Sequence, residues 1–152
     1  MYSKETQKEK NKIYWNTIKK SLNKIPDSHG KKINWLNYPL NLKDTYLRLH
    51  SDKNCVFISI DIQIKDIELR ELIWDQWIEL RTLLDDIISY PSNWIKETHN
   101  STGQSISQIR WDLDFKDFQN EPNFTINFFK EILIKFDMFY SEYGEILKNL
   151  IS

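Results

Sequence analysis

An alternating stretch from Cys55 to Lys65 constrains the fold more than any other part of this chain. Its apolar residues, at every second position, are Val56, Ile58, Ile60, Ile62 and Ile64. Such alternation of β-branched residues predicts a strand with one buried face and one polar face. An amphipathic helix is predicted directly afterwards, with Asp66 as its N-cap and its end near Ile88. We expect the core to assemble on this strand and helix.

The other periodic segments surround this unit. Helical spacing predicts a first helix over 4–25, which Pro26 ends, and a last helix over 124–150. Further strands are expected over 32–40, 46–50, 94–99 and 106–113, with Gly30 at positive φ before the first of them. The expected fold is α+β, in the order α-β-β-β-α-β-β-α. Residues 1–152 would form a single domain, with a largely antiparallel sheet packed by two or three helices.

Composition limits the class of protein. The 152 residues are 40% hydrophobic and 28% charged, which suits a globular domain with its own core. The polar, lysine-rich start of the chain does not resemble a signal peptide, and no apolar run reaches the roughly 18 residues of a membrane span. We therefore expect a cytoplasmic protein. Cys55 is the one cysteine, which excludes an internal disulfide, and we expect a buried thiol there.

Charge gives little support for nucleic-acid binding by the chain as a whole. The formal net charge is −1, so no global field attracts a polyanion. The first forty residues are locally basic, and their lysines are Lys4, Lys8, Lys10, Lys12, Lys19, Lys20, Lys24, Lys31 and Lys32. Weak nucleic-acid binding through this basic helix and Arg48 is one hypothesis, and it predicts affinity that falls steeply with salt. A solvated helix face is the alternative.

Common cofactor and metal motifs are missing from the sequence. Three scattered glycines form no phosphate-binding loop. His29, His50 and His99 include no pair at the i, i+4 spacing that a helix uses to hold zinc. We therefore expect no cofactor and no zinc site of a common type.

Asp61 is the residue on which an enzymatic interpretation depends. It shares a strand face with Gln63 and Lys65 because alternate residues project the same way. A strand-borne carboxylate that holds Mg²⁺ or Mn²⁺, beside an amide or amine that positions water, is typical of metal-dependent nucleases. The expected order of helix, three strands, helix and strand is also that of the PD-(D/E)xK nuclease core. In that case the catalytic residues would be Asp61, Gln63 and Lys65, with Asp61 as the metal ligand.

Two features count against this nuclease hypothesis. The preceding strand, 46–50, carries no acidic residue, and Gln63 stands where such nucleases have lysine. A polar face is also what any one-sided antiparallel sheet presents to water. We therefore expect a solvated or partner-facing strand, and the nuclease is the alternative.

Aromatic residues are unusually frequent, at 14% of the chain with six tryptophans. Large rings fill cores and are also enriched in the centres of protein interfaces. Since no catalytic set is complete, the leading hypothesis is a non-enzymatic domain that binds a protein partner or a second copy of itself. The candidate contact residues are Arg48, His50, Trp35, Trp74, Trp94 and Trp111. Core burial is the alternative for each tryptophan.

Four segments together resemble a known family. They are Lys-Ile-Asn-Trp-Leu-Asn-Tyr (32–38), Tyr-Leu-Arg-Leu (46–49), Phe-Ile-Ser-Ile-Asp-Ile (57–62) and Arg-Glu-Leu-Ile-Trp-Asp-Gln-Trp (70–77). In order and spacing they resemble short, stand-alone bacterial members of the DUF4268 domain family, from about Lys10 to Tyr140. The family is one of unknown function, and some longer members carry the domain beside restriction- or nuclease-related regions. The resemblance thus implies a role near DNA processing or defence, but it supplies no catalytic residues.

Overall fold

The computed structural model describes residues 4–52, 54–114 and 122–150. In chain order the elements are α1 (Lys4–Asn23), a 3-10 turn η1 (Trp35–Asn37), β1 (Thr45–Ser51), β2 (Val56–Ile62), α2 (Ile67–Ile88), β3 (Asn93–His99), β4 (Ser105–Asp112) and α4 (Pro122–Asn149). The domain is therefore α+β, as predicted, with two β-hairpins separated by α2 and flanked by α1 and α4.

The four strands form one antiparallel sheet in the order β1-β2-β4-β3. Each hairpin supplies one edge strand and one central strand, and the two central strands β2 and β4 pair with each other. Ile60 of β2 lies between Leu47 of β1 and Ile109 of β4. All three are buried, so the alternating stretch does form the centre of the core, as its sequence predicts.

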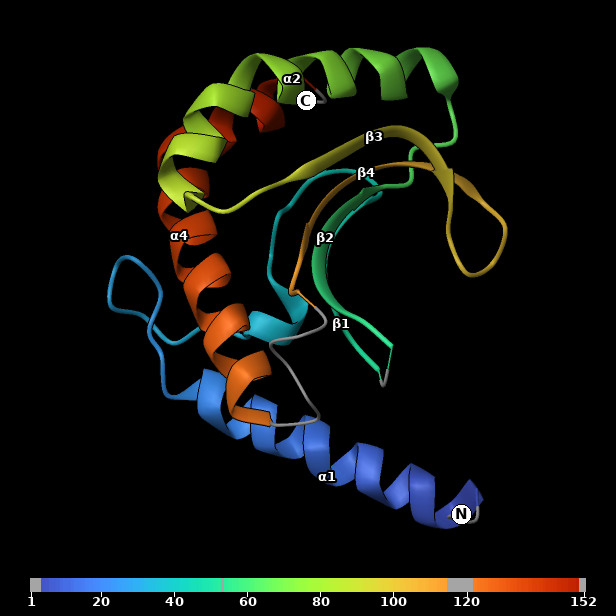
Figure 1. Ribbon diagram of the computed structural model, residues 1–152. Helices are drawn as coiled ribbons and strands as arrows, with labels where there is room; N and C mark the ends of the chain where they lie inside the picture. Colours follow the sequence, from blue (N-terminus) through green and yellow to red (C-terminus); the bar gives the residue numbers. More distant parts are fainter. Residues whose placement is uncertain (1–3, 53, 115–121, 151–152) are drawn as a thin grey trace.

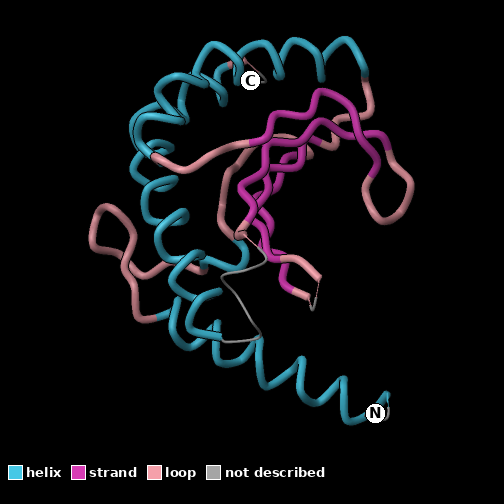
Figure 2. Tube along the Cα trace, viewed as in Figure 1, coloured by secondary structure: helices cyan, strands magenta, loops and turns pink. Residues whose placement is uncertain are grey.

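The helices are grouped on one side of the sheet. Figure 1 shows α4 standing beside the strands, with α1 at its lower end and α2 at its upper end. The sheet curves, and its concave side faces away from α4 (Figure 2). A register shift between Ile95 and Thr98 in β3 adds to the curvature, because a bulge bends and twists its strand. One face of the sheet is therefore packed on helices and the other opens outward.

The aromatic residues mainly fill the space between the sheet and the helices. Trp35, Trp77 and Trp111 are fully buried, as are Phe136 and Phe139 of α4. A buried glycine on the same helix, Gly144, allows close packing, since a Cβ built there would lie 3.1 Å from the ring of Tyr140. The aromatic surplus is thus largely a core feature.

The prediction of a strand over 32–40 is wrong. This segment forms η1, with the Asn37 amide donating to the Asn34 carbonyl at 3.2 Å. Its large side chains are held by hydrogen bonds to other elements instead of by a strand partner: Trp35 Nε1 donates to the Ile25 carbonyl at 2.9 Å and Tyr38 donates to Asp137 at 2.5 Å. With two strands before α2, the described residues do not form the three-strand order that suggested a PD-(D/E)xK core.

Local predictions around α2 are mostly confirmed. Asp66 is its N-cap, and the carboxylate accepts hydrogen bonds from the amides of Glu68 and Leu69. Trp74, one of the candidate contact residues, is buried, and the ring of Trp94 packs edge-on against it at 5.7 Å. Gly30 has a positive φ of 76°, as its turn requires. Within the described ranges, no helix combines the length and the apolarity needed to cross a membrane.

Candidate binding face on the open side of the sheet

The concave side of the sheet carries a set of polar and aromatic side chains that we call the open face. Its members are Tyr46, Arg48 and His50 of β1, Phe57, Ser59 and Asp61 of β2, and Gln108, Arg110 and Asp112 of β4. They occupy alternate positions on three adjacent strands, so the pleat directs them to one side. The residues between them, such as Ile58, Ile60 and Ile109, point into the core.

Asp61 lies at the centre of the open face. Gln108 Nε2 donates to Asp61 Oδ1 at 2.9 Å, and Arg48 Nε lies 3.5 Å from Asp61 Oδ2. Asp61 is only 6% exposed, and Ser59, between Arg48 and Arg110 in the register, is 1% exposed. Side chains converge on a concave surface, and Arg48 and Gln108 both contact Asp61. Of the expected solvated or partner-facing strand, the solvated alternative is therefore wrong for Ser59 and Asp61.

Aromatic rings and arginines are in contact across this face. The Arg110 guanidinium lies over the Phe57 ring, 3.7 Å from its centre, and the His50 ring stacks on Phe57 at 4.5 Å. Arg48 lies over the Tyr46 ring at 4.7 Å. These contacts hold planar groups in fixed orientations, with Tyr46 and Arg48 still exposed.

Each basic side chain of the open face has a carboxylate beside it. Arg48 pairs with Asp61, and Arg110 Nη2 lies 2.6 Å from Asp112 Oδ1. His50 Nε2 lies 2.8 Å from Oδ2 of Asp52, in the turn after β1. The face therefore lacks the surplus of positive charge that a nucleic-acid backbone requires. Its chemistry is that of a polar, aromatic and nearly neutral surface.

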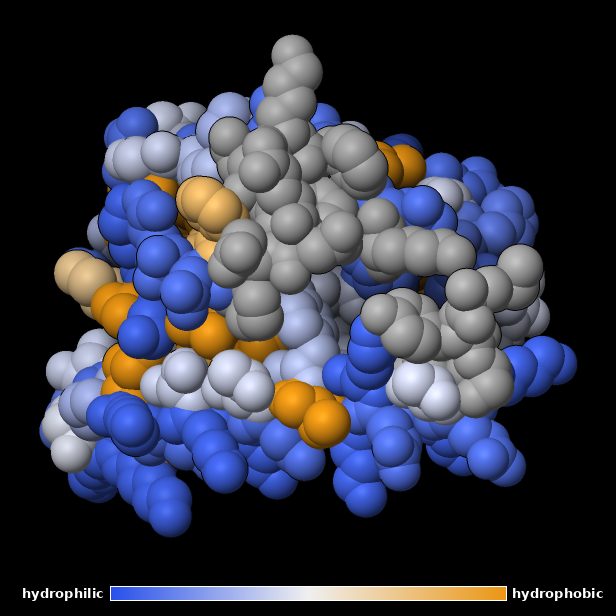
Figure 3. Space-filling view, turned by 60° about the horizontal axis from the view of Figure 1, so that its bottom comes forward, coloured by the Kyte–Doolittle hydropathy of each residue, from blue (hydrophilic) through white to orange (hydrophobic). Residues whose placement is uncertain are grey.

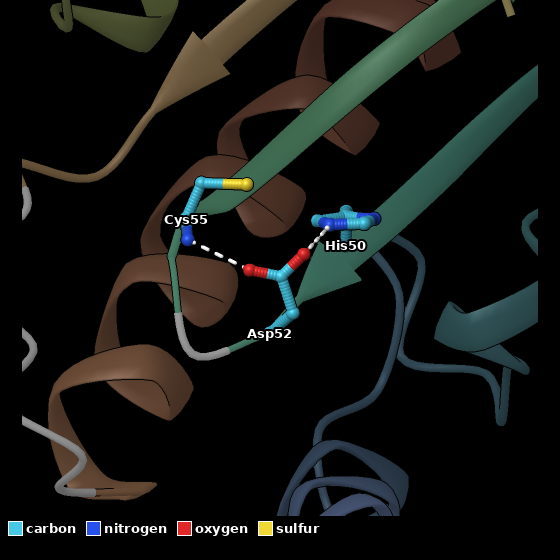
Figure 4. A group of neighbouring side chains, drawn as sticks. All are labelled: His50, Asp52 and Cys55. Atoms are coloured by element: carbon cyan, nitrogen blue, oxygen red, sulfur yellow. Dashed lines mark hydrogen bonds and ion pairs between the residues drawn. The ribbon is translucent and has the colours of Figure 1, made fainter. Parts of the chain in front are cut away.

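The β1–β2 turn at the end of this face brings three different ligand groups together (Figure 4). The ligand atoms of His50, Asp52 and Cys55 all lie within 4.8 Å of one another, and this is the one such group of three among the described residues. Asp52 Oδ1 accepts hydrogen bonds from the amides of Asn54 and Cys55 at 2.7 and 2.9 Å. These three side chains could hold a metal ion.

Electrostatics in the turn follow from these contacts. The hydrogen bond from His50, more than any other contact, lowers the pKa of the Asp52 carboxyl to about 2. Partial burial, and then the charge of Asp52, raises the pKa of the Cys55 thiol. Cys55 is only partly buried, whereas the sequence predicted a buried thiol.

The residues proposed for nuclease chemistry are not assembled by the structure. The Asp61 carboxylate contacts Gln108 and Arg48, and Asp61 belongs to no group of three metal-ligating side chains within the described ranges. Lys65 lies beyond the end of β2 and is exposed, while the Gln63 carbonyl accepts a hydrogen bond from Gln104. The carboxylate is thus committed to neighbours that do not bind metal.

The tryptophans do not form the predicted contact surface. Trp35, Trp74 and Trp111 are buried, so a partner cannot reach these three rings. Trp94 is partly buried against Trp74 and lies under the Arg81 guanidinium, 5.2 Å away. Arg48 and His50 are the candidate contact residues that the structure does place on one accessible face.

The basic first helix packs mainly on α4 and contributes no residue to the open face. The N-terminal lysines are exposed, and the view with α1 turned forward shows a largely hydrophilic surface (Figure 3). A shallow depression beside the helix is lined by Lys19, Asn23, Lys32, Ile33 and Asn34. This arrangement is that of a solvated helix with a basic surface.

Comparison with known families matches most of the chain. A family model described as "Domain of unknown function (DUF4268)" matches residues 11–144. No curated protein and no solved structure matches the sequence. The matched span covers both hairpins and α2, and therefore all of the open face and the ligand group at the turn.

Proposed function

The chain belongs to the DUF4268 family, whose description assigns no function, and we propose that it is a non-enzymatic, cytoplasmic domain that binds another polypeptide through the open face. The observation that carries this proposal is the exposed Tyr46 and Arg48 pair above a layer of satisfied polar groups. Tyrosine and arginine dominate the binding energy of protein interfaces because they combine a large planar area with directed hydrogen bonds.

The polar layer supports the proposal because a partner can cover it at a low desolvation cost. A partner that covers a buried carboxylate without a hydrogen-bond partner loses about 1–3 kcal/mol. Here Asp61 already accepts from Gln108, and Asp112 accepts from Arg110 at 2.6 Å. Covering this face therefore desolvates few unpaired groups. The neutral charge balance also favours a polypeptide over a polyanion on this side.

A cytoplasmic location is part of the proposal. Cys55 is a free cysteine, and cytoplasmic proteins keep such thiols reduced.

The first partner to test is a second copy of the chain. Sedimentation velocity over a wide concentration range would compare the wild type with Tyr46→Ser, on the open face, and with Met138→Ser, on α4. Both residues are substantially exposed, at 42% and 54%, so the two variants remove comparable surface from different sides. We expect self-association that Tyr46→Ser weakens and Met138→Ser leaves unchanged.

A second experiment covers the case in which the partner is a different protein. A photo-crosslinking residue would be placed at position 46 or at position 138 of the full chain in its own cells. Polypeptides captured at 46 should be displaced by excess wild-type protein and not by the Tyr46→Ser variant. A strictly monomeric chain that crosslinks equally at both positions would overturn the proposed function. Salt-sensitive retention on nucleic acid would instead favour the basic first helix.

A further inference from the structure

The turn between β1 and β2 is organised around Asp52, but its structure needs only one of the two carboxylate oxygens. Oδ1 holds the turn by accepting from two backbone amides, while Oδ2 faces the His50 ring at 2.8 Å. Figure 4 shows His50 arriving from β1 and Cys55 standing just before β2, on either side of this carboxylate. An imidazole nitrogen, a carboxylate oxygen and a sulfur therefore converge on one small volume.

Two of the three groups are oriented in advance. The Asp52 carboxylate is fixed by its two amide donors, and the His50 ring is fixed by stacking on Phe57 with an interplanar angle of 12°. Outer contacts of this kind orient the ligands of metal sites and raise metal affinity. Phe57 is in turn held beneath Arg110. His50, through its pairing with Phe57, thus ties the ligand group to strands β1 and β2.

We propose that His50, Asp52 and Cys55 bind one divalent transition-metal ion of the Zn²⁺ class. Nitrogen and sulfur donors favour such ions over Mg²⁺ and Ca²⁺, which prefer oxygen alone. Two ligands about 2.1 Å from a tetrahedral ion lie about 3.4 Å apart. The observed group, with all atoms within 4.8 Å, needs only side-chain adjustments to reach this geometry. Water would complete the coordination.

Binding changes the bonding in a defined way. The Cys55 thiol releases its proton to solvent and its sulfur becomes a ligand, while the metal replaces the contact between His50 and Asp52. The three protein ligands leave one coordination position for water, as in open zinc sites. This inference does not rest on the proposed function, because the ligand group would bind metal whether or not the open face binds a polypeptide.

Cobalt titration of the untagged, reduced, full-length chain tests the site directly. Because Cys55 is the one cysteine, any sulfur-to-cobalt charge-transfer band in the near ultraviolet reports on it alone. We expect a saturable band at one equivalent of Co²⁺ that Zn²⁺ displaces. Cys55→Ser should abolish the band. His50→Gln and Asp52→Asn should each weaken binding at least about tenfold, since even losing an outer contact costs 10–100-fold.

The variants are chosen to separate ligation from folding. Asparagine at 52 keeps an oxygen that can accept the two turn amides, so Asp52→Asn removes a ligand charge while retaining the turn. His99→Gln, in the other hairpin, is the matched histidine control and should leave the titration unchanged. A further readout is the unfolding temperature, which Zn²⁺ should raise in the wild type and leave unchanged in Cys55→Ser. No band with excess Co²⁺, or a band indifferent to both His50→Gln and Asp52→Asn, would overturn the site.

Discussion

Tyr38 donates a 2.5 Å hydrogen bond to Asp137, joining two residues that are 99 positions apart in the sequence. Asp137 also accepts from the amide of Ser28 at 2.7 Å and is buried in α4. One carboxylate therefore holds two points, Ser28 and Tyr38, of the segment that connects α1 to the sheet. This contact, and not pairing with a strand, holds the segment 32–40 against the rest of the domain.

Removing this hydroxyl should destabilise the protein. Tyr38→Phe keeps the ring that stacks on Trp35, but it takes a donor away from a buried carboxylate, which costs about 1–3 kcal/mol in the free energy of unfolding. Urea denaturation measures this loss. Tyr46→Phe, at an exposed position, is the control and should change stability by less than about 0.5 kcal/mol. Equal effects of the two variants would contradict the importance of the contact.

Alkaline pH should destabilise the fold through Tyr38 and Tyr140. Burial is the main cause that raises the pKa of both phenols well above the usual value of 10.0. Below about pH 10 both phenols are protonated in the folded and the unfolded chain, so their contribution to the free energy of unfolding is fully present. Above about pH 10 the unfolded chain loses these protons while the folded chain keeps them, so stability falls as pH rises. Each tyrosine adds a slope of up to about 1.4 kcal/mol per pH unit. A Tyr38→Phe/Tyr140→Phe double variant should show a shallower slope, and an unchanged slope would be evidence against this cause.

Gly144→Ala should lower stability although it improves helix propensity. Alanine in a helix gains about 1 kcal/mol over glycine, but its Cβ would lie 3.1 Å from the Tyr140 ring. That ring cannot easily move because its hydroxyl donates to the Leu40 carbonyl and its face stacks on Phe136. Thermal unfolding measures whether the substitution lowers or raises stability. A raised unfolding temperature would show that the Tyr140 ring can move aside for the added methyl group.

Asp61 should not support metal-dependent cleavage of nucleic acid. Its carboxylate is held by Gln108 and Arg48, so we expect no cleavage of DNA or RNA in Mg²⁺ or Mn²⁺ and no stabilisation by these ions. Asp61→Asn should change the unfolding free energy by less than about 1 kcal/mol, because the ion pair with the half-exposed Arg48 is weak at 3.5 Å and an amide oxygen can still accept from Gln108. Cleavage that Asp61→Ala abolishes would restore the nuclease hypothesis.

Sequence patterns predicted best where the determining contacts are local. The alternation in β2 and the N-cap Asp66 are read within a few residues, and both predictions are confirmed. The segment 32–40 also has strand-like residues, but its structure depends on Asp137, far along the chain. No local pattern contains that partner.

The open face could be predicted in part, because the alternation within each strand is also a local pattern. Strand alternation places Arg48 and Asp61 so that they can share a side, and the structure joins them in an ion pair. Gln108 and Arg110 were missed because the pairing of β2 with β4 links distant segments, although their alternation within a predicted strand was a visible signal. The group of His50, Asp52 and Cys55 does not follow the helical histidine spacing of common zinc sites, because these residues meet across a hairpin turn.

The central pairing of β2 with β4 also sets the order in which the chain can fold. Each hairpin is formed from neighbouring residues, but partners such as Ile58 and Trp111 are far apart in the sequence. Contacts of that separation slow folding, because the chain must close a long loop before they form. During synthesis, β1, β2 and α2 emerge well before β4, so an apolar strand edge stays open until the second hairpin arrives. The pairing of β2 with β4 is therefore the folding step that competes with aggregation.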